Sequence, residues 1–420
     1  MSTTRLLPGA VFLCDGGKLE LAGKHLVLGL TGGIACYKIA ELTRLLIKAG
    51  ATVQIVMTDA ATQFITPVTM QALSGRPVYT SQWDARMPNN MPHIDLSREA
   101  DAIVIAPAST DFLAKIAHGM CDDLLSTLVI ARDCPLLVVP AMNRQMWQNP
   151  ATQRNAAQIR ADGVEVLGPD SGSQACGEVG DGRMIEPEAA FEAICAFFAP
   201  KILRGQRVLI TAGPTFEPLD PVRGLTNRSS GKMGFALARA AAQAGADVHL
   251  VAGPVSLETP WGVYREDVQT AQQMHDAVMA ATPDADIFIA VAAVADWRVD
   301  HVSEQKIKKT ADTLPAFNFV ENPDILASVA KLPNPPYCVG FAAESGDLQV
   351  HGEEKRKRKN VPLLIGNIGQ LTFGRDDNEV VLFEASGLTP LPRADKQELA
   401  RTLIAEIAKR APKTGGALLS

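Results

Sequence analysis

A single thiol stands in a setting that suits chemistry. Cys176 lies within Gly172-Ser173-Gln174-Ala175-Cys176-Gly177, and further glycines stand at positions 168, 180 and 182. Unpaired cysteines are usually packed in a core, whereas these glycines indicate a mobile loop. A glycine-rich loop that carries one thiol is typical of a lid that closes over a bound substrate.

Two loops have the composition of phosphate sites. Thr31-Gly32-Gly33-Ile34-Ala35 stands between an apolar run and a helical pattern, where glycines allow close approach and a helix start offers free N–H groups. Ser229-Ser230-Gly231-Lys232 adds hydroxyls and a cation ahead of a second helical pattern. Neither loop has the Gly-x-Gly-x-x-Gly or the Walker spacing. The first therefore does not specifically indicate a dinucleotide, and taken alone it fits phosphate binding and a tight turn equally well. We predict that the second is a phosphate site of another kind.

The two loops open two similar halves of the chain. Each half begins with a strand, a glycine-bearing loop, a helix, Ala-Gly-Ala and a second strand, over residues 25–57 and 207–251. Short apolar runs typical of buried parallel strands follow at 102–106, 136–139, 287–291, 338–341 and 363–365. We predict an α/β protein of two doubly wound, Rossmann-like parallel-sheet domains joined near 200–206. Ligands should bind at the carboxyl ends of the strands.

Length and composition agree with this prediction. A chain of 420 residues favours two domains of about 200 residues each. The net charge of −6 argues against nucleic acid as a partner, and the basic run at 355–359 is, by composition alone, a solvated helix face. The seven cysteines are scattered, without a Cys-x-x-Cys pair, which favours free thiols in a reducing compartment. No apolar run approaches the length of a membrane span, and residues 1–23 make a poor signal peptide. We therefore expect a cytoplasmic protein with no membrane partner.

The first half carries a series of motifs in an informative order. After the loop at 31–35 come His93-Ile94-Asp95-Leu96, Ala106-Pro107-Ala108-Ser109-Thr110, Lys115-Ile116-Ala117, Asp122-Asp123-Leu124-Leu125, Pro140-Ala141-Met142-Asn143 and Gly172 to Gly177. From about Lys24 to Phe198 this series resembles the FMN-dependent cysteine decarboxylases, specifically the phosphopantothenoylcysteine decarboxylases. The resemblance implies a flavodoxin-like decarboxylase domain at 24–200, after an N-terminal extension at 1–23 for which we predict no function.

The chemistry of such an enzyme explains these residue types. An N-acylated cysteine has no electron sink for the carbanion that loss of CO₂ would leave. Oxidation of its thiol to a thioaldehyde supplies that sink, and a flavin can take up the two electrons and return them. The resemblance implies that His93 is the catalytic base, that Asn143 holds the substrate carboxylate and amide, and that Cys176 is the proton donor to the enethiolate. It further implies substrate contacts from Met146 and Ala175, and FMN contacts from Thr31, Gly32, Gly33, Ile34, Ala35, Thr58, Ser109 and Thr110.

The second half carries its own motif series. It comprises Thr211 to Arg223, Asn227 to Gly234, Ala290 to Trp297, Lys306 to Lys309, Asn322 to Ile325, Gly340 to Glu344, and Lys355 with Lys359. From about Arg207 to the C-terminus this series resembles the phosphopantothenate–cysteine ligases. The resemblance implies a CTP-dependent ligase domain at 201–420. Both halves in this order resemble a fused enzyme of coenzyme A biosynthesis.

The ligase resemblance implies a reaction in two steps. The carboxylate of 4′-phosphopantothenate attacks the α-phosphate of CTP and releases pyrophosphate, and the acyl-cytidylate then acylates the amine of L-cysteine, releasing CMP. Lys306 would offset charge on the leaving group, and Asn227 would serve the formation or resolution of the acyl-cytidylate. A divalent cation, Mg²⁺ or Mn²⁺, would bridge the phosphates through ligands that the sequence leaves unknown. The implied CTP contacts are Ala290, Val291, Ala292, Asp296, Lys306, Asn322, Pro323, Asp324, Ile325, Phe341, Lys355 and Lys359.

Some positions depart from the family pattern. Gly224-Leu225-Thr226 precedes Asn227 where an aromatic residue followed by Ile-Ser or Ile-Thr is usual, Trp297 replaces a common Tyr, and Asn367-Ile368 replaces a frequent Asn-Asp. These departures concern the substrate pocket rather than the reaction.

Two other classes of protein predict features that can be compared with this sequence. A two-domain NAD(P)-dependent oxidoreductase would have an acidic residue that binds the ribose about 20 residues past the first loop. The chain has Met57-Thr58 there, and the nearest acidic residue, Asp59, comes later than this position. A flavoprotein that acts only as a regulator would have no use for a ligase half. The resemblance also implies a homo-oligomer, in which flavin-domain trimers and ligase-domain dimers together permit a closed dodecamer.

Overall fold

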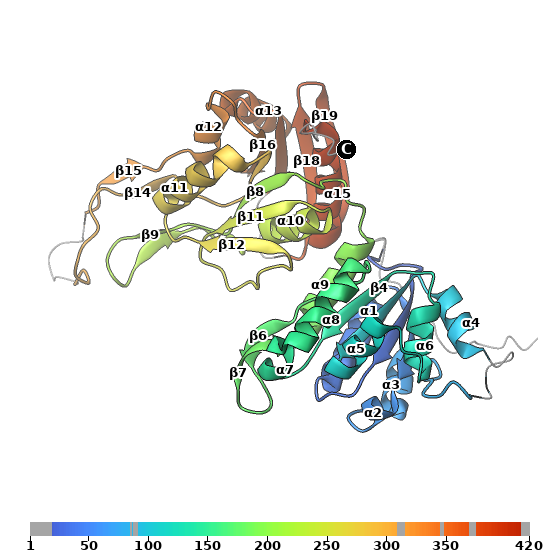
Figure 1. The fold of residues 1–420 in the computed structure, drawn as a ribbon. Coiled ribbons are helices and arrows are strands. Elements are labelled where there is room, and N and C mark those ends of the chain that lie inside the picture. Colours follow the sequence, from blue (N-terminus) through green and yellow to red (C-terminus); the bar gives the residue numbers. More distant parts are fainter. Residues whose placement is uncertain are drawn as a thin grey trace, which may run out of the picture. The chain divides into compact units, whose positions relative to one another are not determined.

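The computed structural model describes residues 19–84, 86, 91–308, 316–344, 348–368 and 375–412. Their contacts divide the chain into two compact units, an N-terminal unit from Leu19 to Phe198 and a C-terminal unit that begins at Ala199 (Figure 1). Each unit is an α/β structure built on its own sheet, and the parallel strands that the two repeated patterns predicted are present in both sheets.

The N-terminal unit has a five-stranded parallel sheet in the order β2-β1-β3-β4-β5. This is the flavodoxin-like order, which places a ligand where the chain reverses direction between β1 and β3. The elements are β1 (His25–Leu30), α1 (Cys36–Lys48), β2 (Thr52–Met57), α2 (Asp59–Thr62), α3 (Pro67–Ser74), α4 (Pro92–Glu99), β3 (Ala102–Ala108), α5 (Thr110–His118), α6 (Leu124–Ala131), β4 (Leu136–Pro140), α7 (Arg144–Gln148), α8 (Pro150–Ala161), β5 (Glu165–Val166), β6 (Asp170–Ser173), β7 (Val179–Arg183) and α9 (Pro187–Phe198).

The central strands of this unit are apolar because helices cover both faces of the sheet. All seven residues of β3 are buried, which is why the run lacks the alternation of a half-exposed strand. Helices α1 and α9 pack together, and α5 packs against α6 and α8 (Figure 1). The buried side of α1 repeats at helical spacing through Ile39, Leu42 and Leu46. At the end of α5, Gly119 adopts a left-handed φ of 67° that closes the helix.

The C-terminal unit has an eight-stranded sheet in the order β12-β11-β8-β13-β16-β17-β18-β19. The first six strands are parallel, and β18 and β19 extend the sheet antiparallel. The elements are β8 (Arg207–Ala212), β9 (Phe216–Pro218), β10 (Gly224–Thr226), α10 (Lys232–Gln243), β11 (Asp247–Ala252), β12 (Val263–Asp267), α11 (Ala271–Ala281), η1 (Thr282–Asp284), β13 (Ile287–Ala290), β14 (Trp297–Val299), β15 (Phe319–Glu321), α12 (Ile325–Ala330), β16 (Tyr337–Glu344), α13 (Leu348–Lys359), β17 (Leu363–Ile368), β18 (Asp377–Glu384), β19 (Gly387–Asp395) and α15 (Lys396–Arg410).

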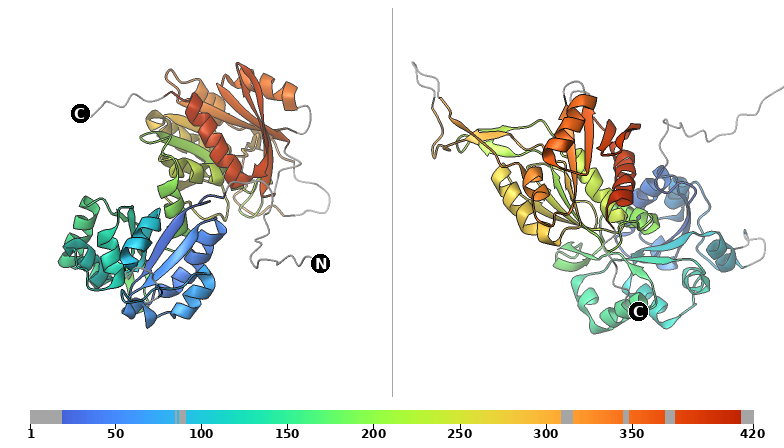
Figure 2. Two further views of the ribbon diagram at one scale, coloured as in Figure 1. Left: turned by 90° about the vertical axis from the view of Figure 1, so that its right-hand side faces the viewer. Right: turned by 90° about the horizontal axis from the view of Figure 1, so that it is seen from above.

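Helices cover both faces of this second sheet. Helices α10 and α15 lie side by side and share one buried cluster with the strands (Figures 1 and 2). Helices α11 and α12 contribute to a separate cluster. The predicted doubly wound architecture is confirmed, whereas the antiparallel pair β18 and β19 was not predicted. No helix among the described residues has the length and apolar character needed to cross a membrane.

Candidate active sites

A cavity of about 360 Å³ opens in the N-terminal unit beyond the carboxyl ends of β1, β3 and β4. This is the switch point that the strand order favours for a ligand. The lining residues are Gly32, Gly33, Ile34, Ala35, Tyr37, Lys38, Ser109, Thr110, Ala141, Met142, Asn143, Met146, Ser173, Gln174, Ala175, Cys176, Gly182, Arg183 and Met184.

The loop after β1 is held against the loop after β3. The Thr31 hydroxyl donates to the Pro107 carbonyl oxygen at 2.6 Å and accepts from the Ser109 N–H at 2.8 Å. A Cβ at Gly32 would lie 2.6 Å from the Cβ of Ala60, so only glycine allows this close approach. Within the described ranges, the N–H groups of residues 32–35 donate to no protein acceptor. They remain available at the start of α1, as the phosphate group of a nucleotide or flavin cofactor requires.

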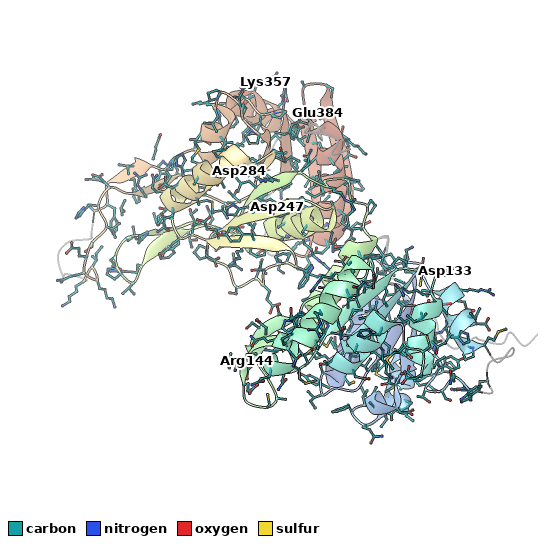
Figure 3. The ribbon with its side chains drawn as sticks, in the orientation of Figure 1. Asp133, Arg144, Asp247, Asp284, Lys357 and Glu384 are labelled. Atoms are coloured by element: carbon teal, nitrogen blue, oxygen red, sulfur yellow. The ribbon has the colours of Figure 1, made fainter. Side chains whose placement is uncertain are left out.

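The predicted substrate residues Asn143, Met146 and Ala175 line the same cavity, together with Cys176. The Asn143 side chain accepts from the Met146 N–H at 2.9 Å and thereby caps α7. The Gln174 side chain accepts from the Arg144 N–H at 3.0 Å, which ties the β6–β7 hairpin to α7. Arg144 lies beside this hairpin (Figure 3). The Cys176 thiol is exposed at the cavity, with Sγ 3.8 Å from Glu178 Oε2.

Gly182 allows the hairpin to dock. Gly182 lies on β7, the strand that follows the loop with Cys176. Its carbonyl oxygen accepts from the Met142 N–H at 2.9 Å. Its φ is +117°, and a Cβ there would lie 2.7 Å from the Met142 carbonyl oxygen. The hairpin that bears Cys176 can therefore approach the Asn143 loop only with glycine at this position.

Three predicted residues, Thr31, Thr58 and His93, are not among those that line this cavity. Thr31 is buried and joins the two loops. His93 is half-buried in α4, which packs against α6, and Thr58 caps α2 by accepting from the Ala61 N–H at 3.2 Å. Their assigned roles stay predictions. Conversely, Lys38 was not predicted but lines the cavity. Its side chain is almost fully buried, and its Nζ donates to the Met184 carbonyl oxygen at 2.8 Å. A lysine within an apolar helical face was the only sequence signal for it.

The C-terminal unit has a cavity of about 350 Å³ around the start of α10. The lining residues are Gly213, Asn227, Arg228, Ser229, Ser230, Gly231, Lys232, Met233, Gly234, Val291, Ala292, Ala293, Val294, Phe341, Ala342, Lys355, Asn367, Asn378 and Lys396. Among these described residues, the charged side chains are all basic. The Ser-Ser-Gly-Lys loop thus lines a cavity whose charge suits a polyphosphate.

Five predicted ligase residues share this cavity, namely Asn227, Val291, Ala292, Phe341 and Lys355. The Asn227 side chain donates to the Ala293 carbonyl oxygen at 2.9 Å, which holds the two loops together. Ala290 ends β13 directly before the lining residues. Lys232, Lys396, Asn367 and Asn378 line the cavity outside the predicted set of CTP contacts.

A second group of predicted residues lies around the start of α12. The Asn322 side chain donates to the Ala295 carbonyl oxygen at 2.8 Å, and its N–H donates to the Asp296 carbonyl oxygen at 2.9 Å. Asp324 caps α12 and pairs with Lys359 of α13. Burial alone would raise the pKa of the Asp324 carboxyl, but the hydrogen bond from Lys359 holds it below its usual value. Pro323 and Ile325 belong to the same segment.

Lys306 stands apart from both groups. Its side chain is exposed in the segment between β14 and β15, and it is not among the residues that line the cavity. The next residue is anchored, because the Ile307 N–H donates to Asp220 Oδ2 at 3.1 Å. Lys309 of the predicted motif lies outside the described residues.

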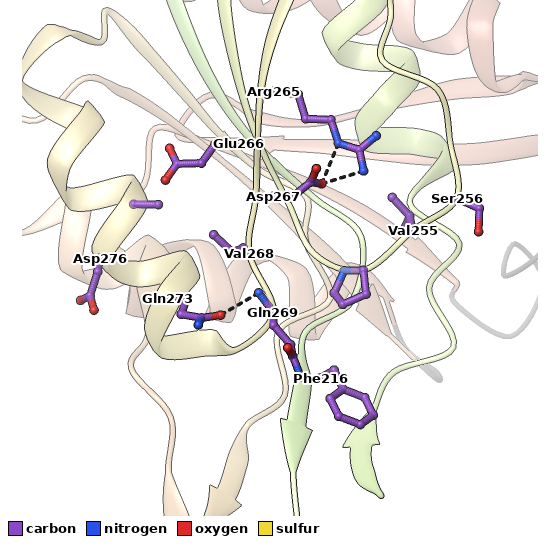
Figure 4. Close-up of a pocket in the computed structure, with 12 residues that line it drawn as sticks. Phe216, Val255, Ser256, Arg265, Glu266, Asp267, Val268, Gln269, Gln273 and Asp276 are labelled. Carbon is purple, nitrogen blue, oxygen red and sulfur yellow. Dashed lines mark hydrogen bonds and ion pairs between the residues drawn. The ribbon is translucent and has the colours of Figure 1, made fainter. Parts of the chain in front are cut away.

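A further cavity of the C-terminal unit, about 1200 Å³, lies beside β12 (Figure 4). Glu266, Asp267 and Asp276 contribute carboxylates to it, and the one arginine, Arg265, donates to Asp267 at 2.8 Å. This charge does not suit a triphosphate, and no predicted site residue lies there.

The comparisons with known proteins cover both units. Residues 17–199 match the family described as Flavoprotein, and residues 203–411 match the DNA/pantothenate metabolism flavoprotein C-terminal domain. The coenzyme A biosynthesis bifunctional protein CoaBC of Vibrio cholerae is 53% identical over 391 residues, which are 92% of this chain and 98% of that protein. Its namesake from Haemophilus influenzae is 48% identical over 400 residues, which are 94% and 100%.

A solved structure of the C-terminal domain of a CoaBC protein is 34% identical, with a TM-score of 0.44, and covers 50% of this chain and 97% of that chain. The sequence matches alone confirm that both halves resemble enzymes of coenzyme A biosynthesis. They do not support the nicotinamide oxidoreductase. With matches of this identity over more than nine-tenths of its length, the chain belongs to the family of coenzyme A biosynthesis bifunctional proteins.

Proposed function

We propose that the chain catalyses two consecutive steps of coenzyme A biosynthesis. The C-terminal unit joins 4′-phosphopantothenate to L-cysteine with CTP, and the N-terminal unit decarboxylates the product to 4′-phosphopantetheine. The observation that carries this proposal is that motif residues of each half line a cavity of their own unit, among them Asn143 and Cys176 in the N-terminal unit and Asn227, Phe341 and Lys355 in the C-terminal unit.

The N-terminal cavity fits FMN by its own geometry as well as by its family match. The open N–H groups of residues 32–35 and the close approach at Gly32 provide a phosphate cradle. When bound, FMN supplies a two-electron acceptor for the substrate thiol and returns the electrons after CO₂ has left. Asn143 orients the substrate carboxylate and amide, Met146 and Ala175 contact the substrate, and Cys176 donates the proton that completes the product.

His93 is the catalytic base in this proposal, and it can act only when protomers assemble. It lies outside the cavity of its own chain, so we propose that it serves the cavity of a neighbouring protomer in a trimer. Exposed apolar side chains beside the flavin loop support such an interface, since Ile34 and Tyr37 are 61% and 64% exposed. Trp297 and Phe319 on the β14–β15 hairpin, 59% and 53% exposed, support a dimer of the ligase units. The two contacts together permit a dodecamer.

In the C-terminal cavity the basic side chains and the start of α10 hold phosphate groups. Asn227 and the strand-end residues 290–292 contact the reacting groups, Phe341 and Lys355 contact the nucleotide, and Lys306 offsets charge on the departing pyrophosphate. The segment Asn322 to Ile325, with Asp296 and Lys359, positions the rest of CTP. A divalent cation, Mg²⁺ or Mn²⁺, accompanies the triphosphate. The cytoplasm suits the enzyme because Cys176 must remain a thiol.

A coupled assay tests the proposal. The purified protein receives 4′-phosphopantothenate, cysteine and CTP, and pyrophosphate, CO₂ and 4′-phosphopantetheine are measured. We expect all three products and a yellow protein. Pyrophosphate without CO₂ would contradict the flavin half of the proposal, and dependence on NAD(P) would contradict both halves. In the Cys176→Ser variant, pyrophosphate release should continue while 4′-phosphopantetheine formation stops at an oxidised aminoenethiol.

A further inference from the structure

Two lysines from distant parts of the sequence meet at one end of the ligase cavity. Lys232 is the first residue of α10, Lys396 is the first residue of α15, and both line the cavity. The short segment before β18 lies between them, because Lys232 Nζ pairs with Asp376 at 2.6 Å and Lys396 Nζ donates to the Arg375 carbonyl oxygen. Packing of α10 against α15 brings the two helix starts together.

The burial of Lys396 requires an explanation. Its residue is only 9% exposed, and lysine is seldom buried to that degree. Burial and the nearby charge of Lys232 both lower the pKa of the Lys396 ammonium. The nearby Asp376 and Asp377 carboxylates raise that pKa, but Asp376 is 88% exposed and Asp377 pairs with Arg393, so solvent and the arginine weaken their effect on the lysines. A bound anion beside the lysines would further relieve their repulsion.

Neutral hydrogen-bond donors line the same cavity. Asn378 is 3% exposed, and its side-chain oxygen accepts from the Glu379 N–H at 2.9 Å and from the Asn367 amide at 3.4 Å. With its oxygen engaged, Asn378 can offer its amide nitrogen to a ligand. The hydroxyls of Ser229 and Ser230 and the N–H groups at the start of α10 line the same cavity. Cations and neutral N–H or O–H donors are the set that binds a phosphate group.

We propose that Lys396, with Lys232 and Asn378, forms a phosphate subsite of the ligase and that Lys396 determines the affinity for one phosphorylated substrate. The inference rests on the proposed ligase function and adds a residue from the C-terminal helix to its site. The ligand is a phosphate group, which either the triphosphate of the nucleotide or the phosphate monoester of the acid can supply.

Lys396→Met tests the subsite, because methionine keeps much of the side-chain length and removes the charge. Ligase KM is measured separately for CTP and for 4′-phosphopantothenate, and decarboxylation of supplied intermediate serves as an internal control in the other unit. We expect the KM of one phosphorylated substrate to rise about tenfold or more, the loss typical of a charge-assisted hydrogen bond, with kcat changed less than about threefold. Lys396→Arg should recover part of the affinity.

The substrate whose KM rises identifies the source of the phosphate group. Lys409→Met is the matched control, since Lys409 lies on the same helix, is 68% exposed and pairs with Glu406. It should leave both KM values unchanged. A folded Lys396→Met enzyme with both KM values within about twofold of the wild type would overturn the proposal.

A measurement on the wild-type enzyme covers the case in which Lys396→Met does not fold. Lysines are labelled with an amine-reactive reagent, and the peptides that contain Lys232 and Lys396 are quantified by mass spectrometry. Pyrophosphate in one arm and 4′-phosphopantothenate in the other should protect Lys232, whose side chain is 39% exposed. Protection by neither would refute the subsite. Protection without any ligase turnover would instead refute the proposed function and leave the subsite standing.

Discussion

The Asp220 carboxylate joins two loops of the ligase unit that are 87 residues apart in sequence. Its Oδ2 accepts from the Ile307 N–H at 3.1 Å and from Arg223 Nη2 at 2.7 Å, and Oδ1 accepts from the Val222 N–H at 2.8 Å. The Arg223 guanidinium also donates to the Ile307 carbonyl oxygen. One buried carboxylate therefore fixes the chain beside Lys306 against the loop that leads to Asn227.

Substitution of Asp220 should impair ligation selectively. In Asp220→Ala the N–H groups of Val222, Arg223 and Ile307 lose their acceptor, so the Lys306 segment loses its anchor. We expect ligase kcat to fall by about tenfold or more, while decarboxylation of supplied intermediate persists. Asp284→Ala is the matched control, because this carboxylate is 81% exposed and pairs only with Arg207 among the described contacts. Equal losses in the two variants would contradict the anchoring role.

The same carboxylate predicts a pH dependence of stability. Burial alone would raise the pKa of Asp220, but the hydrogen bonds from Val222, Arg223 and Ile307 hold it well below the usual value. A depressed carboxyl pKa stabilises the fold above the unfolded-state pKa of about 4, and this contribution is lost as the pH falls further. Thermal unfolding between pH 7 and pH 3 should show this loss in the wild type. The loss should be smaller in Asp220→Asn, and an equal loss would contradict the assignment.

The cysteines should differ sharply in reactivity. Burial raises the pKa of the Cys36 and Cys338 thiols to about 11, whereas Cys121 and Cys176 are exposed. Since the thiolate is the reactive form, brief alkylation at pH 8 should label Cys121 and Cys176 and spare Cys36 and Cys338 until the protein is denatured. Peptide mapping measures each site. Early labelling of Cys338 would show that the core of the ligase unit opens readily.

Gly182→Ala should uncouple the thiol hairpin from the Asn143 loop. The new Cβ would lie 2.7 Å from the Met142 carbonyl oxygen, so the hairpin must shift and carry Cys176 away from the substrate. We expect decarboxylation to fall by about tenfold or more while ligation is retained. Gly119→Ala is the control, because Gly119 has a positive φ of +67° but no atom within 4 Å of its added Cβ. It should lower stability slightly and leave activity unchanged.

The local properties of the sequence determined the elements and the chemistry of the loops. Apolar runs such as Ala102–Ala108 predicted buried strands, and the glycines at 32, 33 and 231 marked the turns where the backbone approaches a ligand. The strands and turns depend on neighbouring residues, so periodicity and residue type suffice to predict them. The two enzyme families were identified by the resemblance of the motif series to known enzymes.

Only the tertiary structure decided which distant side chains share a cavity. Lys396 follows a helix cap near the end of the chain, and it reaches the Ser229–Lys232 loop because α15 packs against α10 beneath one sheet. His93 matches the catalytic base of the decarboxylase family by resemblance, but it lies on α4 and does not line the flavin cavity of the same chain. The antiparallel strands likewise depend on tertiary pairing rather than on their own pattern, because β18 pairs with β17 and β19 pairs with β18. Strand order and helix packing place segments more than 100 residues apart in contact, and no local pattern encodes that placement.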